Sequence, residues 1–110
     1  MKLGLIRCLQ TEDMCSGTTD FKVIKNKKLA FKDVEDDIDI IGFVSCGGCP
    51  GKKAVSRAEG MVKQGADTIA FCSCITKGNP IGVPCPHAEA IINAVKKKLG
   101  NSIKIIDYTH

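Results

Sequence analysis

The sequence predicts an α/β fold, a single-domain three-layer arrangement in which three helices cover a four-stranded parallel sheet. Apolar segments of strand length alternate along the chain with helical segments that have one apolar stripe. The strand segments are nearly continuous apolar runs, which is typical of strands covered by helices on both faces. With 110 residues and 44% hydrophobic content, the chain can form one modest core. We therefore expect one α/β domain over residues 1–110.

The first part of the chain predicts a strand, a helix and a second strand. Residues 2–8 and 39–45 are apolar runs of strand length, separated by a long polar stretch. A helix is expected over residues 18–29, where Phe21 and Ile24 have helical spacing. This helix is the weakest of the three, because the polar residues that follow Ile24 favour an early end.

The second part of the chain continues the alternation. Helices are expected over residues 51–64 and 86–98, each with one apolar stripe and with a glycine near its C-terminal end, where a cap belongs. Strands are expected over residues 68–73 and 103–107, which are short and apolar. Parallel strands joined by helices require right-handed crossover connections, so this alternation favours a doubly wound sheet.

The most compatible strand order is 2-1-3-4, a short flavodoxin-like arrangement with its switch point between the first and third strands. A thioredoxin-like fold is an alternative, since it also places a Cys-x-x-Cys turn after a strand. That fold finishes with a β-hairpin and a helix, whereas this chain finishes on a predicted strand.

The segment 45–51 is the most informative of the chain, since it places Cys46 and Cys49 between a strand and a helix. Cys49 precedes Pro50, so we expect it to cap the following helix, where the helix dipole favours thiolate and lowers the thiol pKa. Cys85 also precedes a proline at a predicted helix start, and we expect the same of it.

Cysteine and histidine recur at the ends of the predicted strands and the starts of the predicted helices. Because parallel strands leave a sheet at one edge, these side chains are expected to face one crevice. Thiolate sulfur and imidazole nitrogen are ligands that soft transition metals prefer. The candidate metal ligands are Cys8, Cys46, Cys49, Cys74, Cys85, His87 and His110. We expect Cys72 to belong to the core, and Cys15 to lie in an open loop.

Composition excludes several classes of function. Lysines balanced by acidic residues, with few aromatic side chains, indicate no nucleic-acid partner. No apolar stretch is long enough for a membrane helix or a signal peptide, so we expect a cytoplasmic protein without a membrane partner. In a reducing cytosol, seven cysteines favour metal or redox chemistry over a disulfide framework. No phosphate-binding glycine motif occurs, and no protein partner is indicated.

Several motifs, spread over essentially the whole chain, together carry a family resemblance. They are Arg7-Cys8, Thr11-Glu12-Asp13-Met14-Cys15, Cys46-Gly47-Gly48-Cys49-Pro50-Gly51, Gly65-Ala66-Asp67, Ser73-Cys74, Pro84-Cys85-Pro86-His87 and Thr109-His110. This combination resembles the CGGC-domain family, small prokaryotic proteins described as metal-binding domains. The resemblance implies a cysteine and histidine metal site at the candidate ligands named above.

The sequence therefore predicts a metal-binding domain that holds Zn²⁺, or alternatively an Fe–S cluster or Cu(I), through thiolates at the carboxyl edge of the sheet. A thiol redox or sulfur-transfer enzyme is the alternative, with Cys46 or Cys49 attacking and its neighbour resolving the intermediate. A third hypothesis is that the protein is an interaction module in which the metal has only a structural role.

Overall fold

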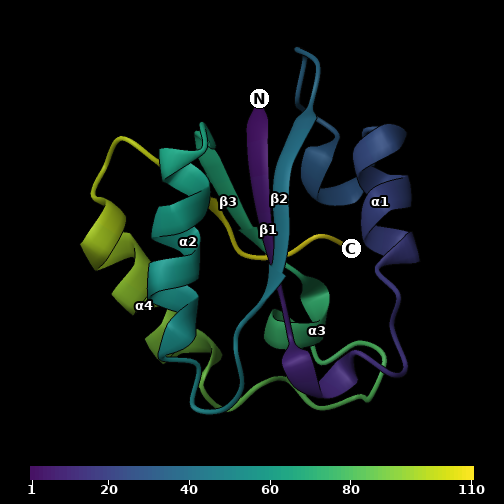
Figure 1. Ribbon diagram of the computed structural model, residues 1–110. Coiled ribbons are helices and arrows are strands. Elements are labelled where there is room, and N and C mark those ends of the chain that lie inside the picture. Colours follow the sequence, from purple (N-terminus) through teal and green to yellow (C-terminus); the bar gives the residue numbers. More distant parts are fainter.

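The computed structural model describes all residues, 1–110, and contains one four-stranded parallel sheet in the order β2-β1-β3-β4 (Figure 1). The strands are β1 (Lys2–Arg7), β2 (Asp39–Ser45), β3 (Thr68–Phe71) and β4 (Lys104–Ile106). The predicted α/β class, strand number and strand order are confirmed.

Helices lie on both faces of this sheet. α2 (Lys53–Lys63) and α4 (Ala88–Leu99) pack side by side on one face, and α1 (Thr18–Lys25) lies on the opposite face (Figure 1). A short helix, α3 (Ser73–Thr76), lies below the carboxyl end of β3. Short 3₁₀ turns at Leu9–Thr11 and Leu29–Phe31 complete the elements. None of the helices has the length and apolar character to cross a membrane.

The core is centred on the two inner strands, β1 and β3. Leu3, Leu5 and Ile6 of β1 are fully buried, as are Ile69 and Phe71 of β3. These strands have a neighbour on each side and helices on each face, which explains why their sequences are continuous apolar runs. The inner strands therefore provide the rigid base from which the loops at the carboxyl edge project.

Three predicted boundaries were wrong in ways that bear on the site. α2 begins at Lys53, after Gly51, whose positive φ of 89° lies outside the helical region. α4 begins at Ala88, with His87 as its N-cap. Neither Cys49 nor Cys85 caps a helix, contrary to prediction.

The third error is at β3, which ends at Phe71 rather than at residue 73. The chain turns at Cys72 into α3, so Ser73 and Cys74 are helical rather than extended. The first helix also ends early, at Lys25 rather than residue 29, and Lys27 then adopts a left-handed conformation with φ of 51°. Polar residues after Ile24 therefore do end that helix.

Candidate functional site

Four thiols lie at the carboxyl edge of the sheet, in the segments that follow β1 and β2 and in the loop before α4. Cys8 follows β1 directly and is 9% exposed. Cys46 follows β2 and is 6% exposed, with its backbone N–H donating to the carbonyl oxygen of Arg7 at 2.7 Å. Cys49 is exposed in the glycine turn, and Cys85 is half-buried in the loop before α4. We call Cys8, Cys46, Cys49 and Cys85 the four-thiol cluster.

Cys85 is near enough to the other three thiols to be affected by their charges. Burial is the largest influence on the Cys85 thiol and raises its pKa, while a hydrogen bond from the His87 backbone N–H, 3.4 Å from Sγ, opposes that shift. The charges of Cys8, Cys49 and Cys46 raise the pKa of Cys85 further. The expected lowering of the Cys85 pKa was therefore wrong, because the thiol is desolvated and lies among other thiols rather than at a helix N-terminus.

The glycine turn fits closely against α4. A Cβ atom on Gly51 would lie 2.3 Å from Cδ1 of Ile91, and its φ of 89° is one that residues with side chains rarely adopt. Gly47 and Gly48 also have positive φ, at 84° and 103°. Glycine at these positions allows the tight turn that contains Cys49 to pack against α4 before α2 begins.

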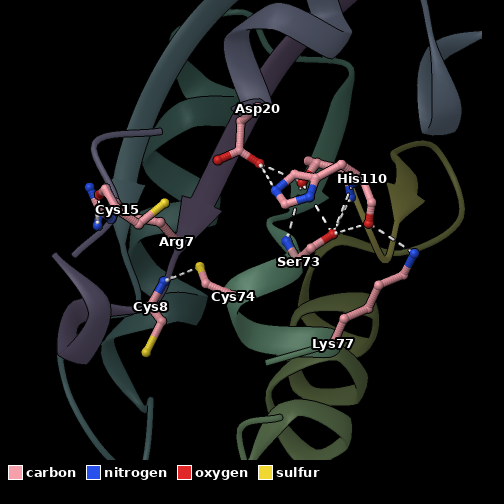
Figure 2. A network of polar contacts seen from close by, with 9 residues as sticks. Arg7, Cys8, Cys15, Asp20, Ser73, Cys74, Lys77 and His110 are labelled. Carbon is pink, nitrogen blue, oxygen red and sulfur yellow. Dashed lines mark hydrogen bonds and ion pairs between the residues drawn. The ribbon is translucent and has the colours of Figure 1, made fainter. Parts of the chain in front are cut away.

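Two more thiols lie on the α1 side of the same edge, around a cavity of about 250 Å³. The Cys8 backbone N–H donates to Cys74 Sγ at 3.2 Å (Figure 2). Burial is the largest influence on Cys74 and raises its pKa. Cys15 is half-buried and lines the same cavity, together with Asp20 and His110. We call this space the Cys15–Cys74 cavity.

A buried carboxylate organises the wall of the Cys15–Cys74 cavity. Asp20 is 2% exposed and accepts a hydrogen bond from the Thr109 hydroxyl. Nε2 of His110 lies 3.7 Å from the Asp20 carboxylate. Ser73 fixes the same segment, since its Oγ accepts from the backbone N–H groups of Thr109 and His110 at 3.0 and 2.9 Å (Figure 2). The segment after β4 is thereby fastened to α1 and α3.

The sequence predicted no site role for Asp20 or for Thr109, although the motif Thr109-His110 contributes to the family resemblance. Asp20 lies in the first turn of α1, where an acidic residue is ordinarily explained by the helix dipole, so its burial leaves little mark on the sequence. Thr109 neighbours a histidine and a tyrosine in a polar stretch. Only the return of the chain end beneath the sheet brings the two together.

Cys72 and Arg7 lie beneath the site rather than in it. Cys72 is fully buried, as predicted, and desolvation raises its pKa strongly, assisted by the nearby Asp20 carboxylate. Arg7 is 9% exposed, stacks its guanidinium 5.7 Å from the Phe43 ring centroid and donates to the Cys15 carbonyl oxygen at 2.6 Å. Arg7 therefore holds the Cys15 loop in place and does not reach the four-thiol cluster as a hydrogen-bond donor.

The predicted ligands thus divide into groups. The four-thiol cluster contains four of them, and Cys74 and His110 line the Cys15–Cys74 cavity. His87 lies at the start of α4, beside a groove of about 330 Å³ formed with Pro50 and Gly51. No three cysteine, histidine, aspartate or glutamate side chains are close enough to grip one metal ion in this conformation. Thiol and imidazole side chains are suitable ligands for a soft metal ion. The thiols must move closer together before they can coordinate one ion.

The family model of the CGGC domain matches residues 2–110. The chain belongs to the CGGC domain family. This confirms the resemblance seen in the sequence, and it covers every residue placed at the candidate site. The CGGC domain is also 29% identical over 111 aligned positions to the uncharacterized protein MJ0582 of Methanocaldococcus jannaschii, covering 96% of this chain and 81% of that protein. No solved structure matches the chain.

Proposed function

We propose that this CGGC domain binds a soft transition-metal ion, Zn²⁺ being the first candidate, through the four-thiol cluster. The observation that supports the proposal most is the charge interaction of Cys8, Cys46 and Cys49 with Cys85 at one edge of the sheet, which raises the pKa of Cys85. The repulsion that disfavours the Cys85 thiolate is relieved when a bound cation neutralises the negative charge of the cluster. Metal binding is therefore the chemistry that this cluster favours.

The glycine turn supplies the movement that binding requires. In a tetrahedral zinc site the sulfurs lie about 2.3 Å from the metal, so four thiols must come close together. Cys8 and Cys46 are buried at strand ends, whereas Cys49 is exposed and follows two glycines with positive φ. Cys49 is the thiol that can move toward the others at least cost, and Cys85 lies in a loop that faces them.

The donor set also bears on which metal is bound. Four thiolates suit Zn²⁺ and Fe–S clusters, and Cu(I) accepts fewer sulfurs of the same kind. His87 adjoins the cluster, and its backbone N–H already orients Cys85 Sγ. Its imidazole is a further ligand or a nearby hydrogen-bond donor. A cytoplasmic location belongs to the same proposal, because a reducing compartment keeps thiols available for metal.

A thiol redox function is the second candidate, and one observation favours it. In the Cys46/Cys49 pair the Cys49 thiol is exposed to solvent, whereas Cys46 is buried, with only 6% of its surface exposed. An exposed thiol can attack a substrate disulfide, and a shielded neighbour can resolve the mixed disulfide. Both functions use the same pair, so the experiment must separate metal occupancy from disulfide formation.

The test is metal analysis of protein purified without oxygen or chelator. We expect about one equivalent of transition metal, since a set of four thiolates forms a high-affinity site. Cys49→Ser should lose most of it, whereas Cys15→Ser, the matched control outside the cluster, should retain it. Less than about a tenth of an equivalent in fully reduced wild-type protein would contradict the metal proposal. A reversible Cys46–Cys49 disulfide in such metal-free protein would favour the redox function.

A further inference from the structure

The Cys15–Cys74 cavity is a polar space with two thiols of unequal exposure. Cys74 is 5% exposed and forms part of its floor, while Cys15 is half-buried at its side. Figure 2 shows both sulfur atoms directed into the space below Asp20. Neither thiol belongs to the four-thiol cluster, and the proposed metal function leaves them without a role.

Hydrogen bonds link the segment between Cys8 and Cys15 to the Cys74 sulfur, and Cys15 and Cys74 line the same cavity. The Cys8 N–H donates to Cys74 Sγ at 3.2 Å, and the Thr11 hydroxyl lies within hydrogen-bonding reach of the same sulfur. The Cys15 N–H donates to the Thr11 carbonyl oxygen at 2.9 Å, and Arg7 holds the Cys15 carbonyl oxygen. The two sulfurs are thus held on one cavity by a continuous network.

The rest of the lining indicates what kind of ligand enters. A volume of about 250 Å³ is below the range of about 300–1,000 Å³ typical of pockets for drug-sized molecules, so the ligand is small. Its lining residues carry hydroxyl, amide, carboxylate and imidazole groups. The polar lining residues are Ser16, Thr18, Thr19, Asp20, Asn79 and His110. A buried carboxylate suits an ammonium group, and hydroxyl and amide donors suit a carboxylate, so the lining matches an amino acid.

We propose that this cavity is a second thiol site, in which Cys15 and Cys74 react with a small amino-acid disulfide of the cystine class. The Cys15 sulfur attacks one sulfur of the disulfide, which forms a mixed disulfide and releases one thiolate. The Cys74 sulfur then attacks the Cys15 sulfur, forms the Cys15–Cys74 bond and releases the second thiolate. The two protons lost by the protein thiols end on the released thiols. The protein is oxidised by two electrons and the substrate disulfide is reduced.

The experiment treats the reduced full-length protein with cystine and maps disulfides by mass spectrometry. Wild-type protein should form the Cys15–Cys74 bond, and Cys74→Ser should stop at a half-cystine adduct on Cys15. Cys15→Ser should form neither product at these positions. Ser102→Ala, a control at an exposed residue outside both the cavity and the four-thiol cluster, should still form the bond. Circular dichroism checks that each variant folds.

Two outcomes would overturn the inference. One is a wild-type protein in which Cys15 keeps the half-cystine adduct while Cys74 stays reduced, since the two thiols then do not meet. The other is an equal rate at Cys15 for cystine and for bis(2-hydroxyethyl) disulfide, which lacks charged groups, since the cavity then does not recognise an amino acid. Metal content of Cys15→Ser is measured in parallel. Unchanged metal content in Cys15→Ser, together with a Cys15–Cys74 bond that fails to form in wild-type protein, would refute this site and leave the proposed metal function intact.

Discussion

At the scale of single residues, burial decides what each thiol can do. Cys72 is fully buried beside the Asp20 carboxylate, and both features raise its pKa, so it remains a protonated core side chain. Cys74 is also desolvated, yet it lines a cavity. Cys49 is exposed at the edge of the four-thiol cluster. Residues of one type thus serve as core, cavity floor and candidate ligand.

Cys85 gives a direct test of this view. In metal-free reduced protein its alkylation by iodoacetamide should have a pH midpoint above that of an ordinary thiol, because burial and the neighbouring thiolates disfavour its ionised form. Site-resolved mass spectrometry across pH measures it. Cys49→Ser should lower the midpoint, since one of the neighbouring charges is removed. A midpoint below the ordinary value would instead support a helix-cap position for Cys85.

Thr109 gives a second prediction at this scale. Thr109→Val removes the hydroxyl that donates to the buried Asp20, so it should lower the free energy of unfolding by about 1–3 kcal/mol. Thr19→Val is the matched control, since Thr19 is exposed and should change stability by no more than about 0.5 kcal/mol. Urea denaturation of both variants makes the comparison, and equal stabilities would show that the Thr109–Asp20 contact contributes nothing.

At the scale of elements, loops rather than helix ends carry the site. The Cys46 to Gly51 turn lies between β2 and α2, and the Cys85 loop lies between α3 and α4. Each loop is anchored where it contacts a regular element. Gly51 packs against Ile91 of α4, and the Cys85 N–H donates to the carbonyl oxygen of Ile75 in α3 at 2.9 Å. The helices therefore position thiols that they do not themselves contain.

Gly51→Ala should disturb both packing and metal binding. Its added methyl group meets Ile91, and its φ of 89° disfavours alanine, which together should lower the free energy of unfolding by about 1 kcal/mol or more. Gly60→Ala is the control, because nothing lies within 4 Å of a Cβ there and the residue is in the middle of α2. It should increase stability by about 0.5–1 kcal/mol. Urea denaturation measures both free energies of unfolding. If Gly51→Ala and Gly60→Ala change the free energy of unfolding in the same direction, the positive φ and close packing of Gly51 do not require glycine there.

At the scale of the whole molecule, the parallel sheet brings all seven cysteines toward one edge, and most of them are at least partly desolvated there. Three of these thiols, Cys72, Cys74 and Cys85, have raised pKa values in the folded protein. Burying neutral thiols is compatible with folding. Burying them as thiolates is unfavourable unless a cation compensates.

This arrangement predicts that the metal-free protein loses stability in alkali. Unfolded thiols ionise near pH 8.5, whereas the three raised groups ionise later in the folded state, so the unfolded state binds fewer protons above that pH. The contribution of these three thiols to the free energy of unfolding should be complete below about pH 8.5. It should fall as pH rises toward their pKa values in the folded protein. Urea denaturation from pH 7 to 10 measures it, and Cys74→Ala should have a shallower fall. Stability that rises over this interval would contradict the assigned shifts.

Much of the fold could be predicted because strand and helix periodicity are local. The runs at β1 and β2 and the stripes of α2 and α4 predicted the order 2-1-3-4, since parallel strands allow few connections. The helix-cap positions of Cys49 and Cys85 were wrong. Proline tolerates the first turn of a helix but does not require one, and the positive φ of Gly51 delays α2.

The sequence by itself determined the α/β class, the family and the gathering of cysteines at the carboxyl edge. Those features depend on residue types and on connections between neighbouring elements. Only the tertiary structure decided that the thiols divide between the four-thiol cluster and the Cys15–Cys74 cavity, and that Asp20 meets Thr109 and His110. Burial, charge and contact between segments 89 residues apart depend on how the chain returns beneath the sheet. No local pattern encodes that return.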